Sequence, residues 1–261
     1  MQGSSHTHLG RRLALAVALL TLALRSAAAP ADETQWRDYE SRIQYGYYTE
    51  DVRALRTIGE AIAQDDSHDP LRGYYAALAA WRLAQLALLN GAAQPQTSPG
   101  ALASRCVHEL DAVLEANADF AAGLALRAAC GSLPLESGGM HAPFAAHKPR
   151  KDLERALQLA PRDPRVLLLD AAADYQLPPS QGGNKERALP KLRRAVAAYE
   201  SERAGPEPLP GWGAPEGYVL LARDLLDHGD GVGARDALER ALLLAPEYVQ
   251  ARRLMARITS G

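Results

Sequence analysis

The chain has 261 residues, of which 29 are Lys or Arg and 31 are Asp or Glu, so its formal net charge at neutral pH is −2. This balance, without any basic run, argues against nucleic acid or an anionic membrane surface as the main partner, because both bind a concentrated positive field. Ala and Leu dominate the composition and β-branched residues are sparse, which predicts an all-α fold.

Residues 1–31 have the pattern of a secretory signal peptide. Arg11 and Arg12 precede an apolar run over 13–24, and small residues follow at 27–29. A membrane-spanning helix needs about 20 apolar residues, which this run does not reach, and no Cys follows it to carry a lipid anchor. We therefore expect cleavage after Ala31, a mature domain over 32–261 without stable membrane insertion, and a periplasmic or secreted location in a bacterium.

Polar caps followed by Pro mark several helix starts. Asp69-Pro70 and Ser98-Pro99 are of this kind, and Thr49 is a further polar residue before an apolar helical pattern. Pro suits the first turn of a helix because the N–H that it lacks would be unbonded there. The helices predicted from these signals and from the flanking patterns cover residues 33–45, 52–63, 71–89, 101–116 and 248–258.

A second pattern recurs along the chain: small Ala residues and larger apolar residues at steps of three and four, which form one face of a helix. The small residues let a paired helix approach closely, while the larger ones fill the gap to the next pair. Gly- and Pro-rich loops over 131–147, 177–183 and 205–214 lengthen the spacing between copies. The copies are Ala54, Ile58 and Ala61; Leu153 and Ala156; Ala188, Leu192 and Ala195; Ala234, Leu238 and Ala241; and, more weakly, Ala112 and Val113.

The segment from Pro215 to Pro246 has the most specific pattern. Its defining residues are Tyr218, Leu221, Ala222, Leu225, Gly229, Ala234, Leu238, Ala241 and Pro246. Their spacing lets two short helices pack through small contact residues, and it resembles a tetratricopeptide repeat (TPR), whose period is about 34 residues. A looser resemblance covers 150–198, where Asp170 and Asp174 stand at positions that the family usually fills with apolar residues.

The resemblance implies an all-α, TPR-like α-α solenoid of about five helix pairs plus a C-terminal capping helix. Such a solenoid would act as a scaffold that binds a protein or peptide partner through its concave surface and catalyses nothing itself. The inward surface lacks the Lys and Asn with which well-known TPR pockets hold a peptide's C-terminal carboxylate, so that ligand is not expected. The inward residues would be Arg165, Leu168, Tyr175, Glu216, Val219 and Arg223.

Charged and aromatic side chains on the predicted helices are the candidates for partner contact. Charges on otherwise apolar helices must be exposed or paired, so either an ion pair between helices or a polar groove explains Arg127, Asp170 and Asp174. Tyr74, Tyr75, Trp81 and Tyr175 either offer broad contact surfaces to a peptide or pack in the core, and Trp81 is expected in the core. The predicted partner-binding residues are Arg127, Asp170, Asp174, Tyr175, Arg223 and His141.

Two Gly-Gly loops, each preceded by Leu-Pro, join the helices of a pair at 138–139 and 182–183. Loops on a rigid scaffold often carry function, whereas glycines can also simply serve turns with positive φ. The alternative function is therefore a small-molecule or metal site at this loop edge, belonging to a solute binder or a modest hydrolase. Its residues would be His141, His147 and Asp174.

Cys106 and Cys130 stand symmetrically about Ala118, near the predicted turn between two helices. This symmetry places them opposite each other, and an oxidising compartment permits a disulfide. Such a bond would contribute about 3 kcal/mol to stability. The other interpretation is two buried free thiols that act as small apolar residues.

Catalytic signatures are broken or missing in the sequence. His108-Glu109 begins like a zinc-protease helix, but Ala112 stands where the second His ligand is required. No serine-nucleophile elbow or phosphate-binding loop is present. We therefore expect a protein that is not an enzyme and that needs no cofactor or metal.

Overall fold

The computed structural model describes residues 31–90, 98–133, 142–203 and 209–260. The chain divides into two compact units, 1–35 and 36–261, and the first of these lies almost wholly outside the described residues. The predicted signal peptide falls in that unit. In the part of the chain that the structure describes, all regular secondary structure is helical and no strand occurs.

The described helices follow one another along the chain. Their bounds are α2 Ala31–Tyr48, α3 Val52–Ala63, α4 Pro70–Asn90, α5 Pro99–Ala116, α6 Ala121–Gly131, α7 Ala142–Leu159, α8 Pro164–Gln176, the short 3₁₀ helix η2 Pro179–Gln181, α9 Lys185–Glu202, α10 Ala214–Asp227, α11 Gly231–Leu244 and α12 Val249–Thr259.

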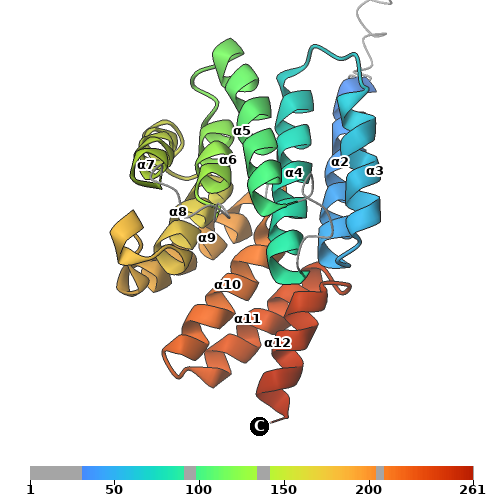
Figure 1. The fold of residues 1–261 in the computed structure, drawn as a ribbon. Coiled ribbons are helices and arrows are strands. Elements are labelled where there is room, and N and C mark those ends of the chain that lie inside the picture. Colours follow the sequence, from blue (N-terminus) through green and yellow to red (C-terminus); the bar gives the residue numbers. More distant parts are fainter. Residues whose placement is uncertain (1–30, 91–97, 134–141, 204–208, 261) are drawn as a thin grey trace, which may run out of the picture. The chain divides into compact units, whose positions relative to one another are not determined.

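Successive helices form pairs. Helix α4 packs on α5, α6 on α7, α8 on α9 and α10 on α11, as Figure 1 shows for α4–α5 and α10–α11. Gly46 of α2 lies against Leu55 of α3, which makes these two helices the first pair. Contacts also join α4 to α6, α6 to α8 and α8 to α10, so the first helices of successive pairs stack, and α12 packs on α11 as the final helix. The predicted all-α arrangement of five helix pairs and a C-terminal helix is confirmed.

Polar side chains cap the helices where the sequence has start signals. Ser98 caps α5 by accepting a hydrogen bond from the backbone N–H of Ala101, and Asp163 caps α8 in the same way. Helix α3 is capped by Asp51 rather than by Thr49, whose hydroxyl instead donates to the carbonyl of Tyr45. Each such cap satisfies an N–H group that the first turn leaves unbonded.

The recurring Ala pattern lies at the contacts between helices. Ala188, Leu192 and Ala195 of α9 are fully buried, and so are the equivalent residues Ala234 and Leu238 of α11. Small side chains at these points allow two backbones to approach, because no large group has to be accommodated between them. The periodic pattern in the sequence thus marks the packing face of each second helix.

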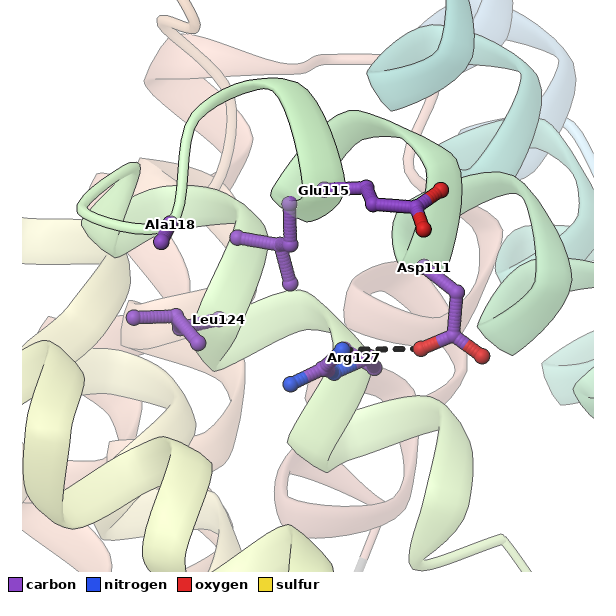
Figure 2. A pocket seen from close by; sticks show the side chains of 6 residues that line it. Asp111, Glu115, Ala118, Leu124 and Arg127 are labelled. Atoms are coloured by element: carbon purple, nitrogen blue, oxygen red, sulfur yellow. Dashed lines mark hydrogen bonds and ion pairs between the residues drawn. The ribbon is translucent and has the colours of Figure 1, made fainter.

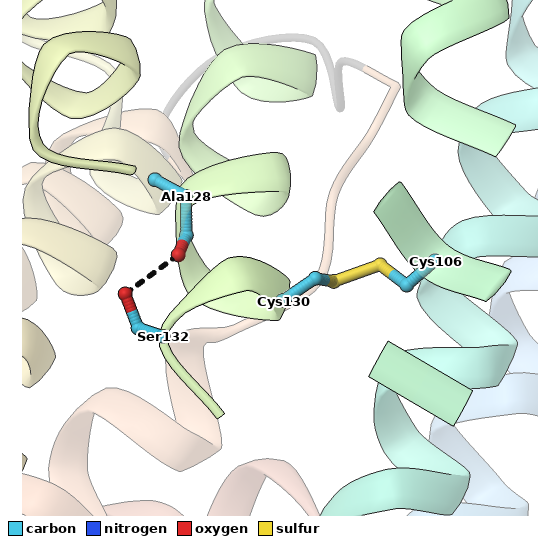
Figure 3. Close-up of a disulfide and its surroundings, with 4 residues drawn as sticks. All are labelled: Cys106, Ala128, Cys130 and Ser132. Carbon is cyan, nitrogen blue, oxygen red and sulfur yellow. Dashed lines mark hydrogen bonds between the residues drawn. A yellow bond between two sulfur atoms is a disulfide. The ribbon is translucent and has the colours of Figure 1, made fainter. Parts of the chain in front are cut away.

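A disulfide joins Cys106 of α5 to Cys130 of α6 (Figure 3). The two Cα atoms are 6.1 Å apart, within the usual range for a disulfide, and both residues are fully buried. The bond therefore links the second helix pair to the third from inside the core.

None of the described helices combines the length and the apolar character that crossing a membrane would require.

Candidate functional site

A buried ion pair joins the beginning of the repeat array to its end. Arg82 of α4 is 1% exposed, and its Nη2 atom pairs with a carboxylate oxygen of Glu216 in α10. The same carboxylate accepts hydrogen bonds from Nε2 of Gln44 at 2.7 Å and from the hydroxyl of Tyr48 at 2.9 Å, both in α2. We call these four residues the Arg82 node. Burial has the largest single effect and disfavours the charged guanidinium, but Glu216 and the surrounding tyrosines together outweigh it and hold the pKa of Arg82 above its usual value.

Aromatic rings surround the Arg82 node. The guanidinium carbon lies 4.1 Å from the ring centroid of Tyr47, 4.6 Å from that of Trp81 and 4.9 Å from that of Trp212. Tyr248, at the start of α12, packs on Tyr48 with ring centroids 4.6 Å apart. Cation–π contacts gain strength where water is excluded. The node is therefore a dry contact that holds α2 and α4 against α10 and α12.

Residues 209–213, which we call the inner strap, lie against α2 and α4 beside the Arg82 node. The backbone N–H of Gly211 donates to both carboxylate oxygens of Glu40, at 3.0 and 2.9 Å. The indole N–H of Trp212 donates to the hydroxyl of Tyr74 at 2.8 Å, and the Trp212 side chain is 3% exposed. A segment predicted to be a loop insertion therefore contributes a core side chain.

The predicted inward surface is only partly open. Tyr175 and Arg223 are partly exposed, as a partner-binding role requires. Tyr74, Tyr75 and Trp81 pack in the core, so these three rings are not available to a peptide. The other residues expected to face a groove are buried, and they are Arg165, Leu168, Glu216 and Val219.

Arg127 is held in ion pairs within the chain. Its Nε and Nη2 atoms donate to the two carboxylate oxygens of Asp152, each at 2.7 Å, and its Nη1 atom donates to Asp111 at 2.8 Å. Beside it lies a hollow of about 350 Å³ between α5 and α6, in which Figure 2 shows the pair with Asp111. With three of its donors used, Arg127 has little capacity left for a ligand. The hollow is lined by Asp111, Leu114, Glu115, Ala118, Leu124 and Arg127.

Asp170 and Asp174 of α8 are also paired, with α9. Lys191 lies 2.8 Å from Asp170 and 2.7 Å from Asp174, and Arg187 donates to Asp174 at 2.6 Å. Burial alone would raise the pKa of Asp174, but its hydrogen bonds to Arg187 and Lys191 outweigh burial and lower it. Of the two explanations open for these charges, the structure shows the ion pair between helices.

The C-terminal ends of α8 and α10 and the first residue of α9 form a polar surface, which we call the α8–α10 surface and define by Tyr175, Lys185, Arg223 and Asp227. The Nζ atom of Lys185 lies 2.8 Å from Oδ2 of Asp227, and the hydroxyl of Tyr175 donates to the same oxygen at 3.1 Å. The hydrogen bond from Lys185 lowers the pKa of Asp227. Burial and the nearby Asp227 raise the pKa of Tyr175 to about 12, so its hydroxyl remains a donor at neutral pH.

The Gly182-Gly183 loop has a structural reason for its glycines. Gly182 has φ of +92°, and a Cβ on Gly183 would lie 1.8 Å from the backbone oxygen of Leu177. The next residue, Asn184, caps α9 through its side chain. Both glycines are therefore required by the turn itself, whatever else the loop does.

The alternative metal or small-molecule site receives no support from the geometry. Both carboxylate oxygens of Asp174 are engaged by cations of α9. No group of three His, Cys, Asp or Glu side chains that could hold a metal occurs within the described ranges. His141 and the other Gly-Gly loop lie outside those ranges, so their predicted roles have no structural test.

Sequence reasoning missed the Arg82 node and the inner strap. Arg82 lies in the predicted helix over 71–89, which is otherwise almost free of charge, and an isolated charge there was a usable signal. Trp212 stands between two glycines in a loop, which gave no periodic signal of burial. Glu216 was expected on the inward surface, but its partners come from helices more than a hundred residues away in the chain.

Comparisons with known proteins bear on the fold. No protein-family model matches the sequence, and no curated protein matches it. Among solved structures, the chain is similar to TTC0263, a thermophilic TPR protein in Thermus thermophilus, with a TM-score of 0.55 and 16% sequence identity. The match covers 87% of this chain and 100% of the other. The chain therefore has a TPR-like fold, an all-α solenoid of helix pairs closed by a C-terminal helix.

Proposed function

We propose that this protein is a scaffold that binds a protein or peptide partner and catalyses no reaction itself. One observation carries the proposal: of the inward residues that the repeat pattern predicts, Tyr175 and Arg223 alone remain partly exposed, and both belong to the α8–α10 surface. TPR-like solenoids present rigid inner helices to their partners. The partner would then contact the later pairs, because the surface of the first pairs is filled by the chain itself.

The composition of the α8–α10 surface suits a binding role. Tyr and Arg are enriched among the residues that dominate binding energy at protein interfaces. The pair between Lys185 and Asp227 is exposed, with 64% and 41% of the two side chains accessible, so it contributes little to stability and is free to exchange partners. The surface thus offers an aromatic ring, two cations and one carboxylate to an incoming chain.

The helices below this surface are held rigidly. Asp174 is tied to α9 through Arg187 and Lys191, and Arg223 of α10 donates to the side chain of Gln250 in α12 at 3.1 Å. Side chains that are already ordered lose less entropy on binding. The proposed mechanism is therefore preorganised contact rather than folding on binding.

Crosslinking in cells that naturally make the protein, followed by mass spectrometry, tests this function. The double variant Tyr175→Ala/Arg223→Ala should recover the crosslinked partner about tenfold less than the unchanged chain. The matched control is Tyr45→Ala/Arg235→Ala, which removes an exposed Tyr and an exposed Arg from α2 and α11. Equal recovery with both double variants, at unchanged helicity, would place the partner site elsewhere.

We also propose that the scaffold acts outside the cytoplasm of a bacterium, after loss of residues 1–31. The support is the sequence of that segment: two arginines, a short apolar run and small residues before Asp32. N-terminal sequencing of protein recovered from the periplasmic fraction should begin at Asp32. Recovery of the uncleaved chain from the cytoplasm alone would contradict this location.

A further inference from the structure

Arg223 of α10 is a half-buried cation without an anionic partner. Its Nη2 atom donates to Oε1 of Gln250 in α12 at 3.1 Å, and it forms no ion pair with any carboxylate that the structure describes. Asp227 stands four residues further along α10, the spacing of a helical ion pair, but it bonds to Lys185 and Tyr175 instead. A guanidinium partly withdrawn from water is stabilised less by a neutral amide than by a carboxylate. Arg223 therefore has both the charge and the unused donors to bind an anion.

Gln250 adds a second unused donor at the same place. The residue is 9% exposed, and its Nε2 atom is inaccessible to solvent and has no hydrogen-bond partner among the described residues. Oε1 of the same amide is the atom that accepts from Arg223, so the unused donor belongs to the group that the guanidinium contacts. A buried donor without an acceptor costs free energy. Arg223 and Gln250 together thus offer several donors, and the single acceptor between them is already used.

Helix α12 continues these donors along one side. Arg253 and Arg257 follow Gln250 by three and seven residues, so all three share one side of the helix. Both arginines are exposed, and α12 contains no Asp or Glu. The Nη1 atom of Arg253 donates to both carboxylate oxygens of Glu50, each at 2.9 Å, whereas Arg257 has no ion-pair partner in the described part of the chain. We call Arg223, Gln250, Arg253 and Arg257 the α12 patch.

The charge of the α12 patch fits a short acidic segment better than a long polyanion. Three arginines face one glutamate, an excess of two positive charges, although the whole chain has a net charge of −2. A nucleic acid or an anionic membrane would bring many negative charges against a surface that carries more acids than bases. A few side-chain carboxylates match the few guanidinium groups that are present, and the guanidinium–carboxylate pair is a strong one.

We propose that the α12 patch binds an extended segment of the partner protein through acidic side chains at alternate positions, in the order Glu-x-Glu-x-Glu. Arg253 and Arg257 are about 6 Å apart along the helix axis, and alternate side chains of an extended chain are about 6.8 Å apart, so the two spacings match. This inference rests on the proposed function, since Arg223 belongs both to the α12 patch and to the α8–α10 surface. It adds the chemical class of the segment that the scaffold binds.

A fluorescein-labelled peptide Gly-Glu-Ser-Glu-Ser-Glu-Gly tests the proposal by anisotropy on the full chain. The peptide is amidated, so only side-chain carboxylates are available to the arginines. The chain should bind it saturably at about 50 mM salt, and a peptide with Gln in place of each Glu should bind about tenfold more weakly. Equal affinity for the two peptides, no binding of the acidic one, or tighter binding of a labelled DNA oligonucleotide would overturn the proposal.

A pair of double variants separates the α12 patch from the field of the whole chain. Arg223→Gln/Arg257→Gln removes two cations of the patch and should weaken binding of the acidic peptide about fivefold or more. Arg56→Gln/Arg105→Gln changes the net charge by the same amount, through exposed arginines of α3 and α5, and should leave binding unchanged. Equal weakening by both double variants would show that no particular arginines hold the peptide, and would overturn the site.

A single substitution supplies from within the chain the carboxylate that the partner is proposed to bring. Gln250→Glu places an acid beside Arg223, so the acidic peptide should bind about fivefold more weakly or less. Gln158→Glu adds the same charge at an exposed position of α7 and is the matched control, with no change expected. Unchanged binding by a folded Gln250→Glu variant would contradict recognition at Arg223.

Crosslinking in cells separates this inference from the proposed function. Recovery of the natural partner should fall with Gln250→Glu as well as with Tyr175→Ala/Arg223→Ala. If only the second variant lowers recovery, the scaffold binds its partner without an acidic segment, and the inference fails while the function stands. If neither variant lowers recovery, the proposed partner surface itself is wrong, and the inference fails with it.

Discussion

The Arg82 node and the α8–α10 surface use the same chemical groups in opposite settings. Each combines a cation, a carboxylate and a tyrosine hydroxyl. The Arg82 side chain is 1% exposed, whereas that of Lys185 is 64% exposed. Water screens the exposed pair, so its interaction is weak. The buried pair is cut off from water, so each charge depends on its protein partners for stabilisation. Burial, and not the presence of an ion pair, thus separates a structural contact from a surface that is free to bind.

Removing one partner of the buried pair should have the largest effect. Arg82→Met leaves Glu216 buried without its cation, and we expect a loss of about 3 to 5 kcal/mol in the free energy of unfolding. Arg235→Met is the matched control, since Arg235 and its partner Glu239 are both exposed, and a loss of about 0.5 kcal/mol or less is expected. Urea denaturation measures the stability loss of both variants. Equal losses would show that the buried and the exposed ion pair contribute equally to stability.

The disulfide stabilises the chain without being part of either region. Cys106→Ser/Cys130→Ser should lower the free energy of unfolding by about 3 kcal/mol, because the bond restricts the unfolded chain across a separation of 24 residues. Partner capture at the α8–α10 surface should stay unchanged in the folded variant. Chemical denaturation gives the first quantity, and a loss below about 1 kcal/mol would argue against a bond that stabilises the fold.

Asp224 of α10 differs from the charges of both regions, because it is buried like the Arg82 node but lacks a close cation. Neither of its carboxylate oxygens accepts a hydrogen bond of good geometry, although Nδ1 of His228 lies 3.3 Å from Oδ1. Burial raises the pKa of Asp224, so the folded chain holds this proton more tightly than the unfolded chain. Asp224→Asn should therefore stabilise the domain by about 1 to 3 kcal/mol at neutral pH.

The pH dependence of this effect has a definite sign. When folding raises the pKa of a carboxyl group, the domain loses stability as pH rises. The loss begins at the unfolded pKa, about 3.9, and continues through the folded pKa. The gain from Asp224→Asn should thus grow as pH rises from the unfolded pKa through the folded pKa, and it should vanish below a pH of about 4. Thermal unfolding across this range measures it. A gain that is independent of pH would show that ionisation of Asp224 is not its cause.

The smallest effect on stability is expected at the α8–α10 surface. Lys185→Ala removes an exposed cation that bonds to Asp227, so the melting temperature should not change measurably. Partner recovery should fall, because the cation is available to a binding chain. A clear loss of melting temperature would instead make this surface a second structural contact, like the Arg82 node.

Local signals predicted the helices well. The predicted helix over 52–63 coincides with α3, and those over 71–89 and 101–116 differ from α4 and α5 only by residues at their ends. Caps, prolines and apolar spacing act within one or two turns, so they can be read from neighbouring residues. The family resemblance over 215–246 then supplied the pairing of helices.

Closure of the inner surface was not predicted because it depends on distant residues. Whether α4 contacts α10 depends on the rotation between each helix pair and the next, accumulated over several pairs. No local sequence pattern predicts this accumulated rotation. Trp212 and Glu216 therefore appeared as parts of a loop and of an open groove. Charge on an apolar helix correctly suggested ion pairs for Arg127, Asp170 and Asp174. The same signal at Arg82 was not used.

A double-mutant cycle on Arg82 and Glu216 tests the closure of the inner surface most directly. The two residues are separated by 134 positions in the chain, so they couple only if the second pair contacts the last one. We predict that Arg82→Met and Glu216→Leu each destabilise the domain strongly, and that the double variant recovers about 2 kcal/mol or more relative to the sum of the two losses. Losses that simply add would show that the two side chains do not meet, and would contradict a TPR-like solenoid closed by its own residues.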